Sequence, residues 1–180
     1  MHKPETRVIT GSLKGKKLLL PDDAAVRPTR ERVRQAVFNT LGSRLDWHGL
    51  AVADICCGSG AWGLEALSRG AAQVWLVDKD VRAVRRNVTA LGLDGDARVQ
   101  VIATDAVTWR PPAPLDVVLA DPPYGSGLVQ GLLARAGTLA AKGAWWALEV
   151  GTAEELDVTL LHNVAEKRYG VSKIVIGQTF

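Results

Sequence analysis

Ala51-Val52-Ala53-Asp54-Ile55, followed by Cys56-Cys57-Gly58-Ser59-Gly60, is the stretch that decides the fold. Its first five residues form a short apolar run with one acid, which predicts a buried strand. The glycines permit a tight turn into a helix that we expect to reach about Arg69. A strand, a glycine loop and a helix in this order predict the first βα unit of a parallel sheet.

The same alternation continues along the chain. We expect parallel strands at residues 73–77, 98–103, 116–120 and 145–149, helices at 80–91 and 128–141, and a short helix near 153–156. Two further strands, at 164–169 and 171–176, are joined at Gly170 tightly enough to be antiparallel. Five parallel strands and a closing hairpin predict an α/β fold with a seven-stranded sheet.

The chain before this sheet is strongly basic. Residues 1–34 contain nine Lys or Arg and four Asp or Glu, a net charge of +5, whereas the whole chain carries +3. We expect a β-hairpin at residues 7–20, and a helix that Thr29 caps and that ends near Leu41. Arginines near the start of that helix oppose its dipole, which favours a ligand contact. The asymmetry predicts a polyanionic partner, with a solvated basic face as the alternative.

Composition excludes several classes of protein. The 180 residues, 47% hydrophobic and 23% charged, are typical of one globular domain with a small appendage. No apolar run approaches the roughly 20 residues that span a bilayer, and the first residues lack a signal-peptide core, so we expect a cytoplasmic protein. Cys56 and Cys57 are adjacent and the three histidines are scattered, so we expect reduced thiols and no metal site.

Acids recur at or near the carboxyl ends of the first four parallel strands. They are Asp54, Asp78, Asp105 and Asp121. In an open α/β sheet these ends converge on one crevice, where ligands bind. A purely structural role does not readily explain four carboxylates at one edge of the sheet, so we expect a ligand site there.

The spacing around the glycine loop indicates which ligand this is. Gly58-Ser59-Gly60-Ala61-Trp62-Gly63 matches G-x-G-x-x-G, a weak signal alone, in which Gly58 and Gly60 let the backbone approach a ligand. Asp54, just before the loop, would repel a pyrophosphate and attract an ammonium group. Asp78 is placed to accept from both hydroxyls of a ribose, and Asp105 or its neighbouring backbone to address an adenine amine. Acceptors for an ammonium group, a ribose and an adenine, in this order, indicate S-adenosylmethionine as the ligand.

Asp121-Pro122-Pro123-Tyr124 follows the fourth strand. The prolines lack an N–H and fix φ, so the carbonyls of Asp121 and Pro122 can project outward. Tyr124 could stack on a flat base while Asp121 and the Pro122 carbonyl accept from its exocyclic amine. A tight strand-ending turn with a buried tyrosine is the alternative interpretation of the tetrapeptide.

These motifs resemble the class I methyltransferases that use S-adenosylmethionine to modify exocyclic amino groups. A narrower resemblance is to the bacterial family that methylates guanine N2 in small-subunit ribosomal RNA, and it covers the chain from Arg7 to about Tyr169. It is carried by Arg7-Val8-Ile9-x-Gly11, Gly15-x-Lys17-Leu18, Arg27-Pro28-Thr29-x-x-x-Val33-Arg34 with Phe38-Asn39, and Gly58 to Gly70. Cys56-Cys57 stands where this family often has Phe-Ala, and Asp78 where Glu is common.

The resemblance implies a seven-stranded Rossmann-like methyltransferase fold and a guanosine substrate within an assembled small ribosomal subunit. The expected catalytic residues are Asp121, Pro122, Pro123 and Tyr124. The expected cofactor-binding residues are Asp54, Cys56, Gly58, Gly60, Asp78, Lys79, Asp105, Ala106 and Asp121. The expected RNA-binding residues are Arg7, Lys14, Lys16, Arg27, Thr29, Arg30 and Arg34. Residues 1–28 would be an RNA-contacting hairpin and linker, and residues 29–180 the methyltransferase domain of a monomer.

Three other functions stay open. The acceptor set at Asp121 serves adenine N6 in DNA or RNA as well as guanine N2. A ribosome-assembly factor without catalytic activity could use the basic hairpin and merely retain a cofactor pocket. A dinucleotide-dependent oxidoreductase is the third alternative, because it shares the glycine motif.

Overall fold

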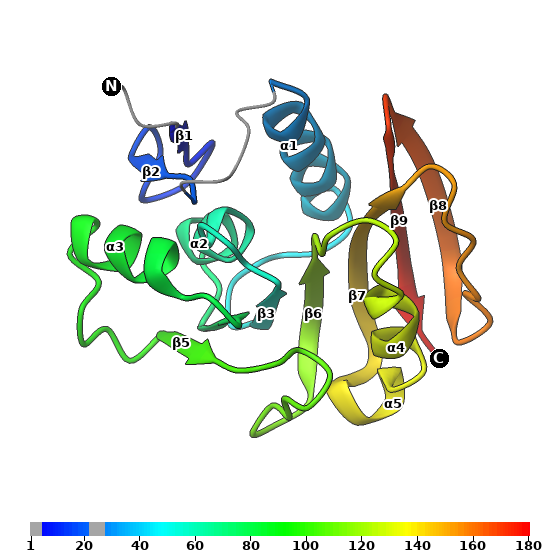
Figure 1. The fold of residues 1–180 in the computed structure, drawn as a ribbon. Coiled ribbons are helices and arrows are strands. Elements are labelled where there is room, and N and C mark those ends of the chain that lie inside the picture. The colour runs from blue at the N-terminus through cyan, green and yellow to red at the C-terminus, as the bar shows by residue number, and fades with distance from the viewer. Residues whose placement is uncertain (1–4, 22–27) are drawn as a thin grey trace.

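A seven-stranded sheet forms the body of the protein in the computed structural model, which describes residues 5–21 and 28–180 (Figure 1). Its strands are β3 (Ala51–Ile55), β4 (Gln73–Asp78), β5 (Val99–Ala103), β6 (Leu115–Ala120), β7 (Ala140–Gly151), β8 (Leu161–Tyr169) and β9 (Ser172–Thr179). Their order is β5-β4-β3-β6-β7-β9-β8. Strands β3 to β7 are parallel, and β9 pairs antiparallel with β7 and β8. The predicted α/β fold with five parallel strands and a closing hairpin is confirmed.

Helices cover both faces of the sheet (Figure 1). On one face lie α1 (Pro28–Gly42), α2 (Ala61–Ser68) and α3 (Arg82–Ala90), and on the other α4 (Leu128–Leu133) and α5 (Ala136–Leu139). Alternate residues of β6 point to opposite faces. Val117 and Leu119 belong to the hydrophobic cluster under α1, α2 and α3, and Val118 and Ala120 belong to the cluster under α4 and α5. A strand buried on both faces explains why its sequence is continuously apolar.

The N-terminal hairpin is shorter than predicted. Its strands are β1 (Glu5–Arg7) and β2 (Lys17–Leu19), paired antiparallel with Thr6 opposite Leu18. Residues 8–16 form a long loop between them. The Val8 N–H donates to the Lys16 carbonyl and the Gly15 N–H to the Val8 carbonyl, and the tip of the loop bonds to α2. Val8 and Leu18 are buried in the same cluster as the apolar faces of α1 and α2.

Two of the predicted helices are wrong in extent or existence. The helix expected at 128–141 is broken into α4 and α5, and Ala140 already belongs to β7. Gly131 and Gly137 lie in this stretch and weaken a continuous helix. The short helix expected near 153–156 is a turn in which the Glu154 carboxylate accepts the Gly151 N–H. Within the described ranges, no helix has the length and apolar content needed to cross a membrane.

Candidate active site

A cavity of about 660 Å³ lies at the carboxyl ends of β3, β4 and β6. It sits where β4 and β6 flank β3 on opposite sides, the switch point at which open α/β sheets bind ligands. Ten of the predicted catalytic and cofactor-binding residues line it: Asp54, Cys56, Gly58, Asp78, Lys79, Ala106, Asp121, Pro122, Pro123 and Tyr124. The predicted crevice is therefore present, and acids from three neighbouring strands face one space.

Gly60 and Asp105, by contrast, do not line the cavity among the described residues. The Asp105 carboxylate bonds to the Lys79 ammonium group at 2.9 Å, and this bond lowers the pKa of Asp105. Gly60 has φ of 77°, and a Cβ there would lie 2.7 Å from a methyl group of Val84. Direct ligand contact by these two residues stays a prediction: Gly60 makes the turn and contacts α3, and Asp105 pairs with a lysine that faces the cavity.

Asp54 is a buried carboxyl group at the base of the cavity, 2% exposed. Its Oδ2 atom accepts a hydrogen bond from the Gly63 N–H at 2.8 Å. Burial raises the pKa of Asp54 to about 7, the nearby Asp78 carboxylate adds to this, and the Arg34 guanidinium opposes it. A carboxyl group held so close to neutrality gains most from a cationic ligand, because an ammonium group restores the favourable charged form.

The glycine loop is tied to β4 through Asp78. The Asp78 Oδ2 atom accepts the Gly58 N–H at 2.8 Å, and Oδ1 accepts the Asp80 N–H at 3.0 Å. Cys56, which opens the loop, has φ of 60°, an uncommon conformation for a residue with a side chain. Burial and the surrounding acids raise the pKa of its thiol to about 12. Cys56 therefore lines the cavity as a neutral thiol, and both cysteines are free.

At Gly63, α2 lies against the sheet too closely for a side chain to fit without a shift. A Cβ there would lie 2.4 Å from Leu76 Cδ2 and 3.0 Å from both Val74 Cγ1 and Asp54 Cβ. Gly63→Ala is expected to lower the free energy of unfolding by about 1–3 kcal/mol, since the sheet must move away. Urea denaturation measures this. The control is Gly131→Ala in α4, where no described atom lies within 4 Å of the new Cβ and a gain of up to about 1 kcal/mol is expected.

Tyr124 is held by an acid that the sequence analysis missed. Its hydroxyl donates to Glu149 Oε1 at 2.8 Å, and partial burial raises the pKa of Tyr124 to about 12. Glu149 is 2% exposed and lies near the end of β7. Glu154 fixes the next turn, because its Oε1 accepts the N–H groups of Gly125 and Gly151, both at 2.8 Å. The signal for Glu149 was available: it is the acid that ends the fifth predicted strand.

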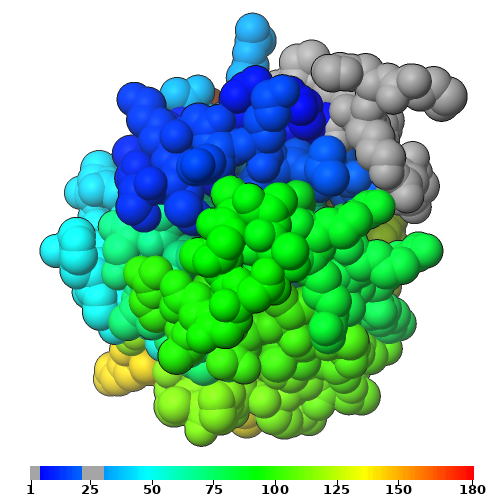
Figure 2. Space-filling model, turned by 90° about the vertical axis from the view of Figure 1, so that its left-hand side faces the viewer, coloured from blue at the N-terminus to red at the C-terminus, as the bar shows by residue number. Residues whose placement is uncertain are grey.

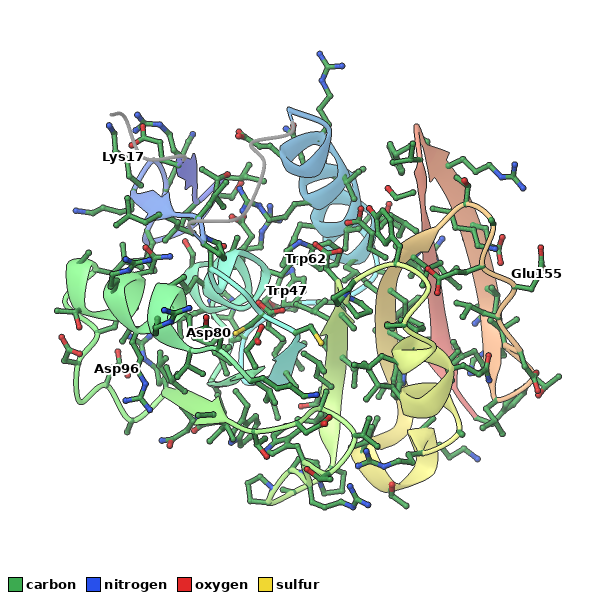
Figure 3. The ribbon with its side chains drawn as sticks, viewed as in Figure 1. Lys17, Trp47, Trp62, Asp80, Asp96 and Glu155 are labelled. Carbon is green, nitrogen blue, oxygen red and sulfur yellow. The ribbon has the colours of Figure 1, made fainter. Side chains whose placement is uncertain are left out.

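The predicted RNA-binding residues fall into three groups: exposed residues of the hairpin, residues whose side chains the structure does not describe, and Arg34. Arg7, Lys14 and Lys16 have exposed side chains on the hairpin, and Figure 3 shows the neighbouring Lys17 pointing outward from it, whereas Trp62 lies in the interior. Arg27 lies outside the described residues, and of Thr29 and Arg30 only the backbone, within α1, is described.

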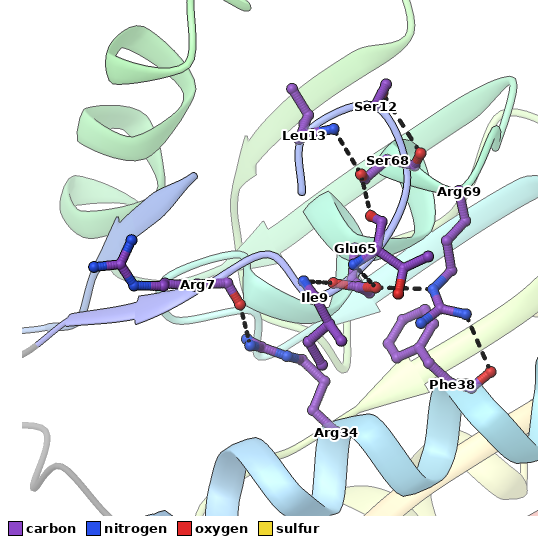
Figure 4. Close-up of polar contacts among 10 residues, drawn as sticks. Arg7, Ile9, Ser12, Leu13, Arg34, Phe38, Glu65, Ser68 and Arg69 are labelled. Atoms are coloured by element: carbon purple, nitrogen blue, oxygen red, sulfur yellow. Dashed lines mark hydrogen bonds and ion pairs between the residues drawn. The ribbon is translucent and has the colours of Figure 1, made fainter. Parts of the chain in front are cut away.

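Arg34 differs from the prediction for a physical reason. Its side chain is 3% exposed and donates to Thr6 Oγ1 and to the Arg7 carbonyl, which Figure 4 shows for Arg7. Burial lowers the pKa of Arg34. Arg34 is therefore not a surface arginine: it holds the hairpin against α1 and lines the cavity from inside, and its contact with RNA stays a prediction.

Basic residues on α3 were not predicted to contact RNA. Arg82, Arg85 and Arg86 are exposed on this helix, and Asn87 of the same helix bonds to Leu19 of β2. Figure 2 shows the hairpin and the segment containing α3 side by side on one face of the molecule. The basic surface of the hairpin therefore continues onto α3. Only the tertiary contact reveals this, because the two segments are far apart in sequence.

The chain is similar to several known proteins. It is 34% identical over 133 residues to ribosomal RNA small subunit methyltransferase D of Escherichia coli (strain K12), a match that covers 70% of this chain and 64% of that protein's length, less than two thirds. It is 35% identical over 135 residues to the putative rRNA methyltransferase YlbH of Bacillus subtilis (strain 168), which covers 71% of each.

The fold also has a close counterpart among solved structures. The putative methyltransferase yhhF from Escherichia coli superposes with a TM-score of 0.82 at 28% identity, over 98% of both chains. Of the residues that the structure describes, no group of three or more His, Cys, Asp or Glu could hold a metal ion. Residues 6–178 match the family described as Conserved hypothetical protein 95, and the chain belongs to this family.

Proposed function

We propose that the protein transfers a methyl group from S-adenosylmethionine to the exocyclic N2 of a guanosine in small-subunit ribosomal RNA. The observation that carries the proposal is one cavity in which Asp54 and Asp78 lie on the side of the glycine loop and Asp121 to Tyr124 form another wall. The similarity to proteins named as rRNA methyltransferases supports the substrate class.

The cavity fits the proposed cofactor in size and in donor set. Its volume of about 660 Å³ lies within the usual range for sites that hold drug-sized ligands. Asp54, buried and close to neutral, is suited to the ammonium group, and Asp78 retains acceptor capacity for ribose hydroxyls. Ala106 and Lys79 line the side where the adenine would lie. The bound cofactor supplies an electrophilic methyl group on a sulfonium.

The acceptor base would be held by the Asp121–Tyr124 corner. Tyr124 offers a partly exposed ring fixed by Glu149, on which an extruded base can stack. Asp121 and the Pro122 carbonyl accept the two N–H bonds of the amine, which draws electron density onto a nitrogen whose lone pair is delocalised into the ring. These acceptors would stabilise the positive charge that develops on nitrogen as it takes the methyl group, and the Asp121 carboxylate would take up the proton that the nitrogen then loses.

Mass analysis of nucleosides from the ribosomal RNA of a deletion strain tests this function. Loss of one N2-methylguanosine, restored by the wild-type gene, is expected. Unchanged N2-methylguanosine would contradict the proposal, and loss of an N6-methyladenosine instead would identify adenine as the substrate base. Calorimetry with S-adenosylhomocysteine and with NAD separates a methyltransferase from a dinucleotide-dependent enzyme.

RNA binding is expected to depend steeply on salt, because exposed cations of the hairpin would neutralise phosphates. With about three contacts, affinity should fall roughly 20-fold or more between about 50 and 200 mM salt. Replacing Lys14 and Lys16 together by alanine is expected to make the plot of log affinity against log salt concentration shallower, by the amount that the loss of about two phosphate contacts predicts. Titrations at several salt concentrations measure this slope. Lys142→Ala is the matched control, since Lys142 is exposed near the start of β7, at the end of the sheet away from the cavity. An unchanged slope in the double variant would exclude the hairpin from the RNA interface.

A further inference from the structure

The hairpin forms part of the wall of the cavity. Glu5 and Thr6 of β1, and Leu20 and Pro21 after β2, line the same space as residues 56–59 of the glycine loop. The segment that carries the predicted phosphate contacts is thus also a wall of the proposed cofactor site. Anything that fixes this segment relative to the glycine loop shapes both sites.

Asn87 of α3 joins these two walls. Its side chain is 1% exposed, accepts the Leu19 N–H at 2.8 Å, and donates to the Leu19 carbonyl at 2.9 Å. Its amide nitrogen also donates to the Ser59 carbonyl, at 2.8 Å. Binding both backbone groups of Leu19 together with the Ser59 carbonyl takes one acceptor and two donors, which a side-chain amide supplies. One buried amide therefore connects β2 directly to the glycine loop.

A different set of contacts attaches the hairpin loop to α2 (Figure 4). The Glu65 carboxylate accepts the N–H groups of Ile9 and Thr10, at 2.6 and 3.1 Å. Ser68 Oγ accepts the Leu13 N–H at 2.9 Å and donates to the Thr10 carbonyl. Neither Glu65 nor Ser68 lines the cavity. These contacts hold the hairpin without touching the glycine loop, so they offer a matched comparison for Asn87.

We propose that Asn87 is a positioning residue that couples the hairpin to the glycine loop, so that cofactor binding and RNA docking strengthen one another. This inference rests on the proposed function. A ligand that orders the glycine loop fixes the Ser59 carbonyl on the Asn87 amide and, through the same amide, fixes β2. RNA that holds the hairpin would in turn fix the glycine loop through the same amide. Linkage requires that each ligand strengthen the binding of the other by the same factor.

The variant that tests this is Asn87→Asp, with Ser68→Ala as its control. Asn87→Asp keeps the size of the side chain and the acceptor for the Leu19 N–H, but its carboxylate cannot donate to either carbonyl. We expect its affinity for S-adenosylhomocysteine to fall about tenfold, and added RNA to no longer tighten binding. Ser68→Ala loosens the hairpin loop as well, yet is expected to keep the affinity within about twofold and to retain the effect of RNA. Calorimetry gives both values, and thermal melts verify that the variants are folded.

Two outcomes would overturn the inference: a folded Asn87→Asp protein with wild-type affinity and wild-type response to RNA, or an equal loss of both in Ser68→Ala. Hydrogen exchange of the wild type tests it without any variant. Saturating S-adenosylhomocysteine is expected to slow amide exchange at residues 17–20, and unchanged exchange there contradicts the coupling. If the wild type binds no S-adenosylhomocysteine at all, the proposed function itself fails. If it binds both ligands independently, only the coupling fails.

Discussion

Asp121→Ala is expected to lower the rate of methyl transfer about 1000-fold. Alanine removes the carboxylate proposed to accept from the exocyclic amine and to stabilise the charge on nitrogen. We expect β6 to keep its fold, because Asp121 lies just beyond that strand. Transfer of a labelled methyl group to small subunits from a deletion strain, under single-turnover conditions, measures the rate. The affinity for S-adenosylhomocysteine is measured separately, since Asp121 also lines the space expected to hold the cofactor.

Tyr124→Phe is the control for this experiment. It keeps the aromatic ring and removes the hydroxyl that donates to Glu149 at 2.8 Å. Loss of this positioning contact is expected to reduce the rate by about tenfold or less, far below the effect at Asp121. An Asp121→Ala protein that restores methylation in the deletion strain would refute the catalytic assignment. Restored growth with no methylation would favour the assembly-factor alternative.

Binding of the cofactor product is expected to weaken as pH falls through about 7, the pKa to which burial raises Asp54. The ammonium group of S-adenosylhomocysteine binds the ionised carboxylate, and at a pH about one unit below this pKa only about a tenth of the carboxyl groups are ionised. We therefore expect affinity to drop several-fold between about pH 8 and pH 6. In Asp54→Asn, affinity should be at least tenfold weaker at the higher pH and nearly independent of pH. Calorimetry across this range measures both.

The stability of the same variant separates binding from folding. The pKa of Asp54 rises on folding from 3.8 to about 7, so the protonated form is favoured in the folded protein, and the free energy of unfolding falls as pH rises through this interval. Asp54→Asn removes that cost while its amide oxygen can still accept the Gly63 N–H. The variant is expected to be as stable as the wild type, or more stable, at pH 8. A variant that binds poorly because it is unfolded would contradict this explanation.

The sheet and three of the four predicted acids in the cavity follow from sequence because each depends on a local pattern. A short apolar run marks a buried strand, and an acid at its end marks the ligand edge, as at Asp54, Asp78 and Asp121. Asp105 departs from this pattern because β5 ends at Ala103, two residues earlier, and a lysine is close enough to pair with it.

Other features depend on contacts that no local pattern encodes. Asn87 is one polar residue on an amphipathic helix, and its partners are backbone groups 68 and 28 residues away. Arg34 has the sequence context of a surface arginine, but its guanidinium group bonds to Thr6 and Arg7 on a hairpin whose docking is a tertiary event. The break between α4 and α5 reflects weak helix formers that the apolar periodicity of residues 128–141 outweighed in the prediction.

The docking of the hairpin also sets an order of folding during synthesis. Its backbone bonds reach Glu65 from 56 residues away and Asn87 from 68 residues away. Residues 5–21 therefore cannot take their place until residues near 90 have left the ribosome, and until then the apolar side chains of Val8 and Leu18 lack the partners that bury them. Arg7 next to Val8, and Lys16 and Lys17 before Leu18, favour solvation of the hairpin segment until it docks. The hairpin is therefore expected to be among the last parts of residues 5–90 to become structured.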